Sequence, residues 1–336
     1  MKRSSFVSIF FLSVFFTGCI VAILSLSLGS VSIPLRDVIR VLLGDGGVEN
    51  GWKIILFELR LPRICTSLVA GGALSVAGLG MQTLFQNPLA GPFVLGINAG
   101  ASLGVALATL LAGSLASLGL ATSSWLGSTV VLIVMMGVAG KVKNNTTLLI
   151  LGLMIGYGVS AFVNVLIHFS SPERIQQFIV WSFGSFSSVS WRQLLFLVPA
   201  ACVGFCAMLF FAKQLNALLL GEAYASTMGV SVYRVRLALI VITSLLAGSV
   251  TAFCGPVAFL GVAVPHLCRQ ALKTGDHRIL IPACALSGGV LALTADFVAH
   301  MPGSAMVLPL NAVTSLVGAP VVIWIVLRSR RGGNVS

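Results

Sequence analysis

Ten apolar stretches, each close to the length that crosses a bilayer, constrain this chain more than any other feature of its sequence. A transmembrane helix needs about 20 mostly apolar residues. Charged residues make up only 8% of the chain, against roughly 25% in a soluble domain. The sequence therefore predicts an all-α integral membrane protein: one compact bundle of about ten transmembrane helices in a single domain, residues 1–336. The predicted spans are 6–28, 64–84, 93–113, 118–139, 147–168, 192–212, 234–254, 257–271, 279–299 and 307–327.

Two of these stretches need separate interpretation. The first follows a basic N-terminus and resembles a signal peptide, but its apolar run exceeds the 7–15 residues of such a peptide. We therefore interpret it as a retained first span. The eighth is short and carries Pro265, with Pro256 just before it. A broken or tilted helix is expected there, with neighbouring protein satisfying the freed backbone groups.

The distribution of basic residues predicts the topology. Ten spans place both termini on one side, and a cytoplasmic placement puts thirteen of the 20 Lys and Arg residues there, with two of the eight acidic residues. Cytoplasmic loops are enriched in Lys and Arg. Because the basic residues are scattered rather than gathered in one patch, the net charge of +12 does not indicate nucleic-acid binding. The thirteen are Lys2, Arg3, Lys141, Lys143, Lys213, Arg234, Arg236, Arg269, Lys273, Arg278, Arg328, Arg330 and Arg331.

Small residues predict close helix packing and a weak internal repeat. Residues 71–80 are rich in Gly and Ala, which let transmembrane helices approach closely. Residues 68–78 align loosely with 245–255. Since the two spans would run in opposite directions, the halves of the chain are expected to be inverted repeats, as in many transporters.

Four segments carry most of the remaining information. The chain includes LRLPR and MQTLFQNPLAGP within 57–104, LGEAYASTMGV within 218–236, PHLCR and GDHR within 254–282, and LPLNAVTSLVGAP within 308–331. Together, and in this order, they resemble the permease subunit of the iron-chelate and vitamin B12 importer family (FecCD-type ABC importers). The resemblance covers residues from about 30 to 330.

The resemblance implies partners, a location and a cargo. It implies a homodimer, or a pair with a close paralogue, in the bacterial inner membrane. Two cytoplasmic ATP-binding subunits and an extracytoplasmic substrate-binding protein would complete the importer. A ferric siderophore is the first candidate cargo, with cobalamin or haem as alternatives and a bare oxyanion as a remote one. The chain itself has no P-loop pattern, so we expect no ATPase activity, no cofactor and no resident metal in it. An ion-coupled secondary carrier is the alternative from another class.

The resemblance also assigns residues at the outer face. The family's outer arginines, which pair with glutamates of the binding protein, fall on Arg60 and Arg63, and His300 takes the place of a third. Guanidinium groups suit bidentate carboxylate contacts, so we expect Arg60 and Arg63 to face water; ordinary interfacial anchoring is the alternative. A neutral His300 would pair weakly with a carboxylate, and its charge would change near a pKa of about 6.5.

The inner face carries the predicted coupling loop, at about 213–233. A short helix is expected there, starting after Gly221 and ending before Gly229, as a protein-contact surface for the ATPase. The assigned coupling residues are Leu220, Gly221, Glu222, Ala223, Met228 and Gly229. Gln82, Asn87 and Pro88 are assigned to an inner turn beside the pathway.

A set of polar residues near the inner face is predicted to position the coupling loops. These are His266, Arg269, Asp276, His277 and Arg278. Their spacing is poor for a metal site, which is the alternative.

Two further features leave alternatives open. Cys202 and Cys206 are one helical turn apart, and we interpret them as buried cysteines that act as small apolar side chains, with a metal site as the alternative. Asp296 is an acid near a span interior and so a functional candidate by default, with solvation at a helix end as the other interpretation.

Overall fold

Every regular element in the described part of the chain is a helix. The structure is a computed structural model. It describes residues 2–29, 31–44, 49–111, 119–142, 144–300 and 307–332, without the side chains of 2–4, 111 and 324–332. Some residues behind the predicted topology therefore lie outside the described residues or side chains, namely Lys2, Arg3, Lys143, Arg328, Arg330 and Arg331.

Each predicted span contains a helix, which confirms the all-α membrane fold. Seven helices in the described ranges are long and apolar enough to cross a membrane; the stretches Ile97–Leu110 and Leu310–Ile323, within two of the other predicted spans, are shorter apolar helices. The helices of the ten spans are α1 (Lys2–Ser27), α4 (Leu61–Leu84), α5 (Ile97–Ala106), α6 (Leu120–Ala139), α7 (Asn145–His168), α9 (Trp191–Phe210), α12 (Val232–Cys254), α13 (Leu260–Leu272), α14 (His277–Ala299) and α15 (Leu310–Gly332).

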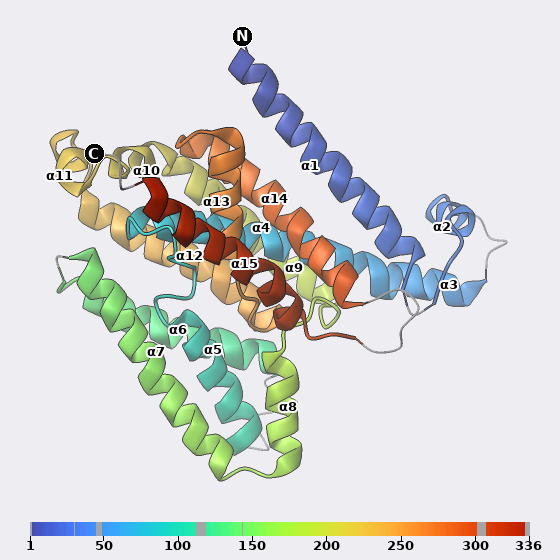
Figure 1. Cartoon of the computed structure of the whole chain (residues 1–336). Helices are drawn as coiled ribbons and strands as arrows, with labels where there is room; N and C mark the ends of the chain where they lie inside the picture. The colour runs from blue at the N-terminus through green and yellow to red at the C-terminus, as the bar shows by residue number, and fades with distance from the viewer. Residues whose placement is uncertain are drawn as a thin grey trace.

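Short helices occupy the two ends of this bundle (Figure 1). One end carries α2 (Leu35–Leu42) and α3 (Asn50–Ile54), and we name it the α2 end. The opposite end carries α10 (Ala212–Leu218) and α11 (Glu222–Thr227), and we name it the α11 end. Between α3 and α4 lies the π-helical stretch η1 (Ile55–Arg60), so that Asn50–Leu84 is one run of 35 helical residues. The remaining helices are η2 (Leu107–Leu111), which extends α5, and α8 (Pro172–Ser182).

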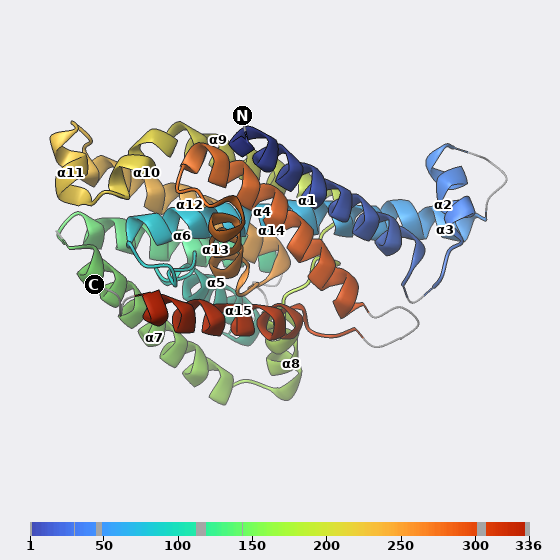
Figure 2. The ribbon, with the colours of Figure 1, turned by 45° about the horizontal axis from the view of Figure 1, so that its top comes forward.

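Helix α4 lies at the centre of the bundle. It packs against α9, α12, α13 and α14, and 83% of its apolar window is buried. Helix α12 packs beside it in the opposite direction, starting near α11 and ending towards the α2 end (Figures 1 and 2). These are the two helices of the weak internal repeat, and their antiparallel arrangement is the one that inverted repeats require.

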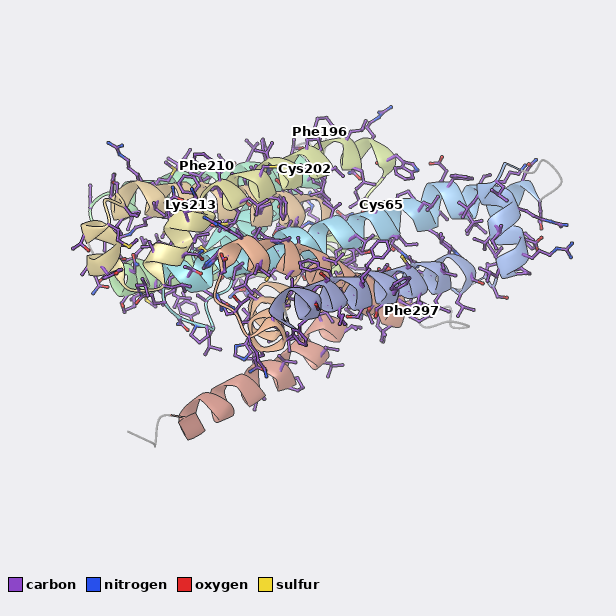
Figure 3. All side chains as sticks on the ribbon, turned by 90° about the horizontal axis from the view of Figure 1, so that it is seen from above. Cys65, Phe196, Cys202, Phe210, Lys213 and Phe297 are labelled. Carbon is purple, nitrogen blue, oxygen red and sulfur yellow. The ribbon has the colours of Figure 1, made fainter. Side chains whose placement is uncertain are left out.

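The peripheral helices present apolar side chains outward, as a lipid environment demands. Helix α1 rests mainly on α14, and none of its apolar window is buried. On α9, Phe196 and Phe210 are 67% and 75% exposed and lie along the outer edge of the bundle in Figure 3. Cys202 and Cys206 of the same helix are exposed free thiols, which corrects the interpretation that they are buried.

Glycines bring the backbones of α4 and α14 into direct contact, as the small residues predicted. A Cβ atom on Gly72 would lie 2.8 Å from the carbonyl oxygen of Ala285, and one on Gly289 would lie 2.7 Å from that of Leu68. A backbone carbonyl cannot move aside as the end of a flexible side chain can. A Cβ on Gly78 would similarly overlap the carbonyl oxygen of Gly261, at the contact of α4 with α13.

Two predicted spans are modified by breaks in the backbone. Helix α13 has only 13 residues, with Pro265 inside it, and it follows Gly255 and Phe259, both in positive-φ conformations. This confirms the interrupted eighth span. The third span, predicted to start at residue 93, starts at Ile97 instead, because Gly96 adopts a left-handed conformation that ends the preceding turn.

The close α4–α14 contact gives a test of the fold. Gly289→Ala should lower the free energy of unfolding by about 1–3 kcal/mol, because the added methyl must displace backbone. Thermal unfolding of the detergent-purified protein would measure the effect. Gly137→Ala on α6 is the matched control, since a Cβ there meets nothing within 4 Å. Equal behaviour of the two variants would contradict the close contact.

Candidate functional sites at the two ends of the bundle

The α11 end presents an apolar surface formed by a short helix between two glycine turns. Gly221 and Gly229 have φ values of 102° and 82°, which favour glycine strongly, and they bound α11 as the sequence predicted. Leu220, Tyr224 and Met228 are 64%, 53% and 60% exposed. Ala223 is also exposed. These apolar side chains lie on and beside a short helix between two longer ones, at one end of the bundle. An exposed apolar group of this kind is suited to contact another protein.

Glu222, by contrast, is bound within the chain. Its carboxylate accepts from the side chain of Asn145 at the start of α7 and lies 3.4 Å from a guanidinium nitrogen of Arg236 on α12. Arg236 also donates to the carbonyl of Val142 at 2.9 Å. Glu222 therefore fastens α11 to α7 and α12, and the exposed apolar surface is formed by its neighbours.

The predicted polar network near the α11 end divides into two parts, and both bind the end of α4. In the first part, Arg269 on α13 donates to the side-chain oxygen of Gln82 at 2.6 Å. Gln82 in turn donates to the carbonyl of Val262 at 3.0 Å. Gln82 is 3% exposed, so it bridges α4 to α13 and is buried among helices rather than beside an open pathway.

The second part centres on Asn216, which sequence reasoning missed. The side-chain oxygen of Asn216 accepts from the backbone N–H of His277 at 2.9 Å and lies 2.7 Å from His277 Nδ1. Because that oxygen only accepts, Nδ1 must carry a proton. His277 Nε2 lies 2.8 Å from the hydroxyl of Thr83 on α4. Asn216 thus joins α10 to α14 and, through His277, to α4.

Asp276 completes this second part at the start of α14. Its carboxylate accepts from the side-chain amide of Asn216 at 2.7 Å and from the backbone N–H of Arg278 at 3.0 Å, as a helix N-cap does. The hydrogen bond from Asn216 holds the pKa of Asp276 below its ordinary value.

The other assigned residues of this end lie apart from these contacts. His266 Nε2 is 2.8 Å from the side-chain amide of Gln270 on its own helix, and the side chain of Arg278 is exposed. Asn87 stabilises its own turn, accepting from the backbone N–H of Leu89 at 2.9 Å, and Pro88 is exposed. Among the described residues, no group of three or more His, Cys, Asp or Glu side chains is arranged to hold a metal ion.

At the α2 end, Arg60 is buried inside the chain. Its guanidinium group donates to the carbonyls of Leu26, in the last turn of α1, and of Val31, and only 5% of the residue is exposed. A cation that satisfies the last carbonyls of a helix is a favourable C-terminal cap. The expectation that Arg60 faces water is therefore wrong: it fastens α1 to η1.

Arg63 and His300 both contact Asp296 on α14. Arg63 Nε lies 3.0 Å from one carboxylate oxygen of Asp296, and the two side chains are 11% and 1% exposed. Nδ1 of His300 lies 3.4 Å from the other carboxylate oxygen and 2.9 Å from the Asp296 carbonyl. His300 Nε2 lies 3.1 Å from the hydroxyl of Ser187. The structure thus brings together two of the three predicted docking residues, but around an internal carboxylate rather than facing water.

Asp296 is consequently the counter-ion of a buried arginine. Solvation at a helix end is therefore excluded for that residue, because its side chain is only 1% exposed; its functional role stays a prediction. The spacing of Asp296 and His300, one helical turn apart, is visible in the sequence. Their convergence with Arg63 depends on how α4 packs against α14, which the sequence does not show.

Loss of Asn216 tests the second part of the network. Asn216→Ala should leave buried donors of His277 unpaired, each costing about 1–3 kcal/mol. We expect faster amide hydrogen exchange in α10 and at the start of α14, measured by mass spectrometry. Lys213→Ala is the control, since Lys213 is exposed on the same helix (Figure 3). Unchanged exchange in Asn216→Ala would contradict the role of Asn216.

A double-mutant cycle tests the buried ion pair. Asp296→Asn should lower the free energy of unfolding by about 3–5 kcal/mol, because it leaves the Arg63 charge uncompensated. The double variant with Arg63→Gln should recover part of this loss, and thermal unfolding would measure both. The partly exposed pair Arg40–Asp37, 3.7 Å apart, is the control and should contribute less than about 1 kcal/mol. Additive effects of Arg63→Gln and Asp296→Asn would refute the pairing.

Comparisons with known proteins agree on one family. The FecCD transport family matches residues 17–328. The vitamin B12 import system permease protein BtuC of Shigella boydii serotype 18 is 35% identical over 293 residues, covering 86% of this chain and 88% of the relative. BtuC of Escherichia coli O9:H4 is 35% identical over 292 residues, with the same coverage of both chains.

Solved structures show the same fold. A metal-chelate type ABC transporter in an inward-facing conformation superposes with a TM-score of 0.84 at 28% identity, covering 95% of this chain and 98% of that one. PsaBC from Streptococcus pneumoniae, solved with a Fab, has a TM-score of 0.54 at 14% identity, covering 85% and 94%, and supports the fold alone. The sequence match, the ten-helix arrangement and these relatives together place the chain: it is a multi-pass membrane permease of an ABC importer and belongs to the FecCD transport family.

Proposed function

We propose that this chain, as a single permease domain over residues 1–336, imports a metal chelate in a dimer driven by separate ATP-binding subunits. The first candidate cargo is a ferric siderophore. The observation that carries the proposal is the exposed apolar surface of Leu220, Tyr224 and Met228 at the α11 end. Such a surface, at the end of an apolar bundle and bounded by glycine turns, is suited to receive a partner subunit.

The α11 end is the cytoplasmic one in this proposal. Three basic residues lie at that end: Lys141 in the turn after α6, Lys213 in α10 and Arg234 in the first turn of α12. This agrees with the excess of Lys and Arg on the cytoplasmic side of membrane proteins. Both chain termini would then be cytoplasmic and the α2 end would face outward, in the bacterial inner membrane. A second copy of this chain, or a close paralogue, would form the other half of the channel.

Docking of a substrate-binding protein at the α2 end cannot use the free arginines that the sequence predicted, because Arg60 and Arg63 already have partners within the chain. Arg60 and Arg63 reach an external carboxylate only by giving up their bonds to carbonyls and to Asp296. We propose that docking exchanges the Asp296 contact of Arg63 and His300 for carboxylates of the binding protein. The exchange leaves the buried Asp296 carboxylate without its partners, which offsets the new ion pairs, so docking gains specificity more than affinity.

Cobalamin is the second candidate cargo. The two BtuC relatives, each 35% identical to this chain, are named as vitamin B12 import permeases. The inward-facing relative of 28% identity is named as a metal-chelate type transporter. Both cargoes are bulky metal chelates, so the same architecture would serve either. Haem is a further alternative with this architecture.

Reconstitution tests the energy source and the cargo together. Proteoliposomes holding this permease would be assayed for uptake of a radiolabelled ferric catecholate, ferric hydroxamate or cyanocobalamin, with the ATP-binding subunits and binding protein added singly and together. We expect uptake only when both partners and ATP are present. Gradient-driven uptake by the permease alone would contradict the proposal and favour a secondary carrier.

Gly229 tests the coupling surface. At φ 82° a side chain strains the backbone by roughly 1–2 kcal/mol, although a Cβ there meets no atom within 4 Å. Gly229→Val should therefore shift the turn after α11 and lower the cargo moved per ATP hydrolysed, while membrane insertion stays normal. Gly137→Val, in the open surface of α6, is the control. An unchanged ratio of transport to hydrolysis in Gly229→Val would place coupling elsewhere.

A further inference from the structure

A cavity of about 860 Å³ lies between η2, α8 and the end of α12 that points towards the α2 end. Helix α8 packs against η2 and α5 there, and Figure 1 shows α8 beside the ends of α5 and α7. Ligand-binding cavities for molecules of drug-like size measure roughly 300–1,000 Å³. The cavity is therefore large enough for a compact chelate, whereas a corrinoid is considerably bulkier.

Hydrogen-bond donors dominate the polar part of its described lining. Arg174, Gln176, Gln177 and Ser188 contribute polar side chains, and no carboxylate is among the described lining residues. One guanidinium nitrogen of Arg174 donates to the carbonyl of Leu110 at 3.1 Å, which anchors the cation at the cavity wall. The indole N–H of Trp181 is buried and has no hydrogen-bond partner among the described residues. Because that nitrogen is buried, Trp181 meets the cavity with its ring rather than with its N–H.

Apolar groups form the rest of the wall. Val180, Phe253 and Leu120 line the cavity together with the rings of Trp181. Gly255 also lines it, at a φ of 72°. A donor-rich, cationic face beside an apolar wall matches a molecule whose oxygen acceptors carry negative charge and whose remaining surface is carbon.

We propose that this cavity receives the cargo as it enters the permease, and that the cargo is an anionic, oxygen-rich ferric chelate held by Arg174 and Trp181. This inference rests on the proposed import function and narrows its cargo class. Siderophore chelates with catecholate or carboxylate ligands have this chemistry. Cobalamin does not present a comparable ring of anionic oxygens.

The loop that follows α8 connects the cavity to Asp296 and its partners Arg63 and His300. Ser185 and Ser188 line the cavity, and Ser187 between them bonds His300 at 3.1 Å. Ser188 also donates to the carbonyl of Phe253, a cavity residue, at 3.3 Å. A binding protein that displaces His300 would thus pull directly on the cavity wall, which places the cavity where a docked protein can release its chelate.

Tryptophan fluorescence tests the proposal on the full-length permease in nanodiscs. The probes are an anionic ferric tris-catecholate, a neutral ferric trihydroxamate and cyanocobalamin, with N-acetyltryptophanamide correcting for light absorption. We expect saturable quenching by the tris-catecholate, with Trp181→Phe removing most of the quenching amplitude. Arg174→Gln should weaken its apparent affinity about tenfold or more, as loss of a charge-assisted hydrogen bond does. Arg174→Lys should retain more affinity than Arg174→Gln.

Arg192→Gln is the matched control, because Arg192 is an exposed arginine at the start of α9 and does not line the cavity. It should quench as the unmodified protein does, and Arg174→Gln should change the quenching by the neutral chelate far less than that by the anionic one. Non-saturable quenching, equal losses in the two arginine variants, or tighter binding of cyanocobalamin would overturn the proposal. ATP-dependent uptake in proteoliposomes alongside such a result would leave the import function standing and remove only this cavity.

Discussion

Direct contact between the backbones of α4 and α14 is the constraint on which the rest of the structure depends. Glycines at 72 and 289 leave no space for a side chain between the two helices. The contact sets the position of α4, which in turn packs against α9, α12 and α13. In lipid, the hydrophobic effect does not drive helices together, because lipid tails are as apolar as the helix surfaces. Close packing therefore supplies much of the energy of helix association.

Two sets of charged and polar side chains attach to the two ends of this central helix. Arg63 at one end pairs with Asp296 of α14. Gln82 and Thr83 at the other end contact Arg269 and His277. The same pair of helices therefore joins the region where a binding protein is proposed to dock to the region where an ATPase is proposed to dock. Because the interior between them is apolar and closely packed, movement at one end cannot be absorbed locally.

Much of this architecture was predictable from the sequence, because lipid imposes a length and a composition on every span. The ten spans, the interrupted eighth span and the bounds of the α11 helix followed from apolar runs, Pro265 and Gly221. The contacts of the charged residues did not follow. Arg60 and Arg63 precede a span in the sequence, where exposure is the ordinary expectation, yet a helix end and a carboxylate more than 200 residues away draw them inward. Asn216 is an unremarkable polar residue until the fold places α10 against α14.

The run Asn50–Leu84 has a consequence that reaches beyond packing. At 1.5 Å per residue, its 35 residues extend about 52 Å, whereas the hydrocarbon core of a bilayer is about 30 Å thick. Its first turns therefore stand clear of the lipid, with the π-helical stretch η1 just above the contact with α14. A partner that pushes sideways on this projecting part works at the long arm of a lever whose fulcrum is the glycine contact. The short arm ends at Gln82 and Thr83, so a push at the α2 end would arrive as a displacement beside α10, which packs against α4.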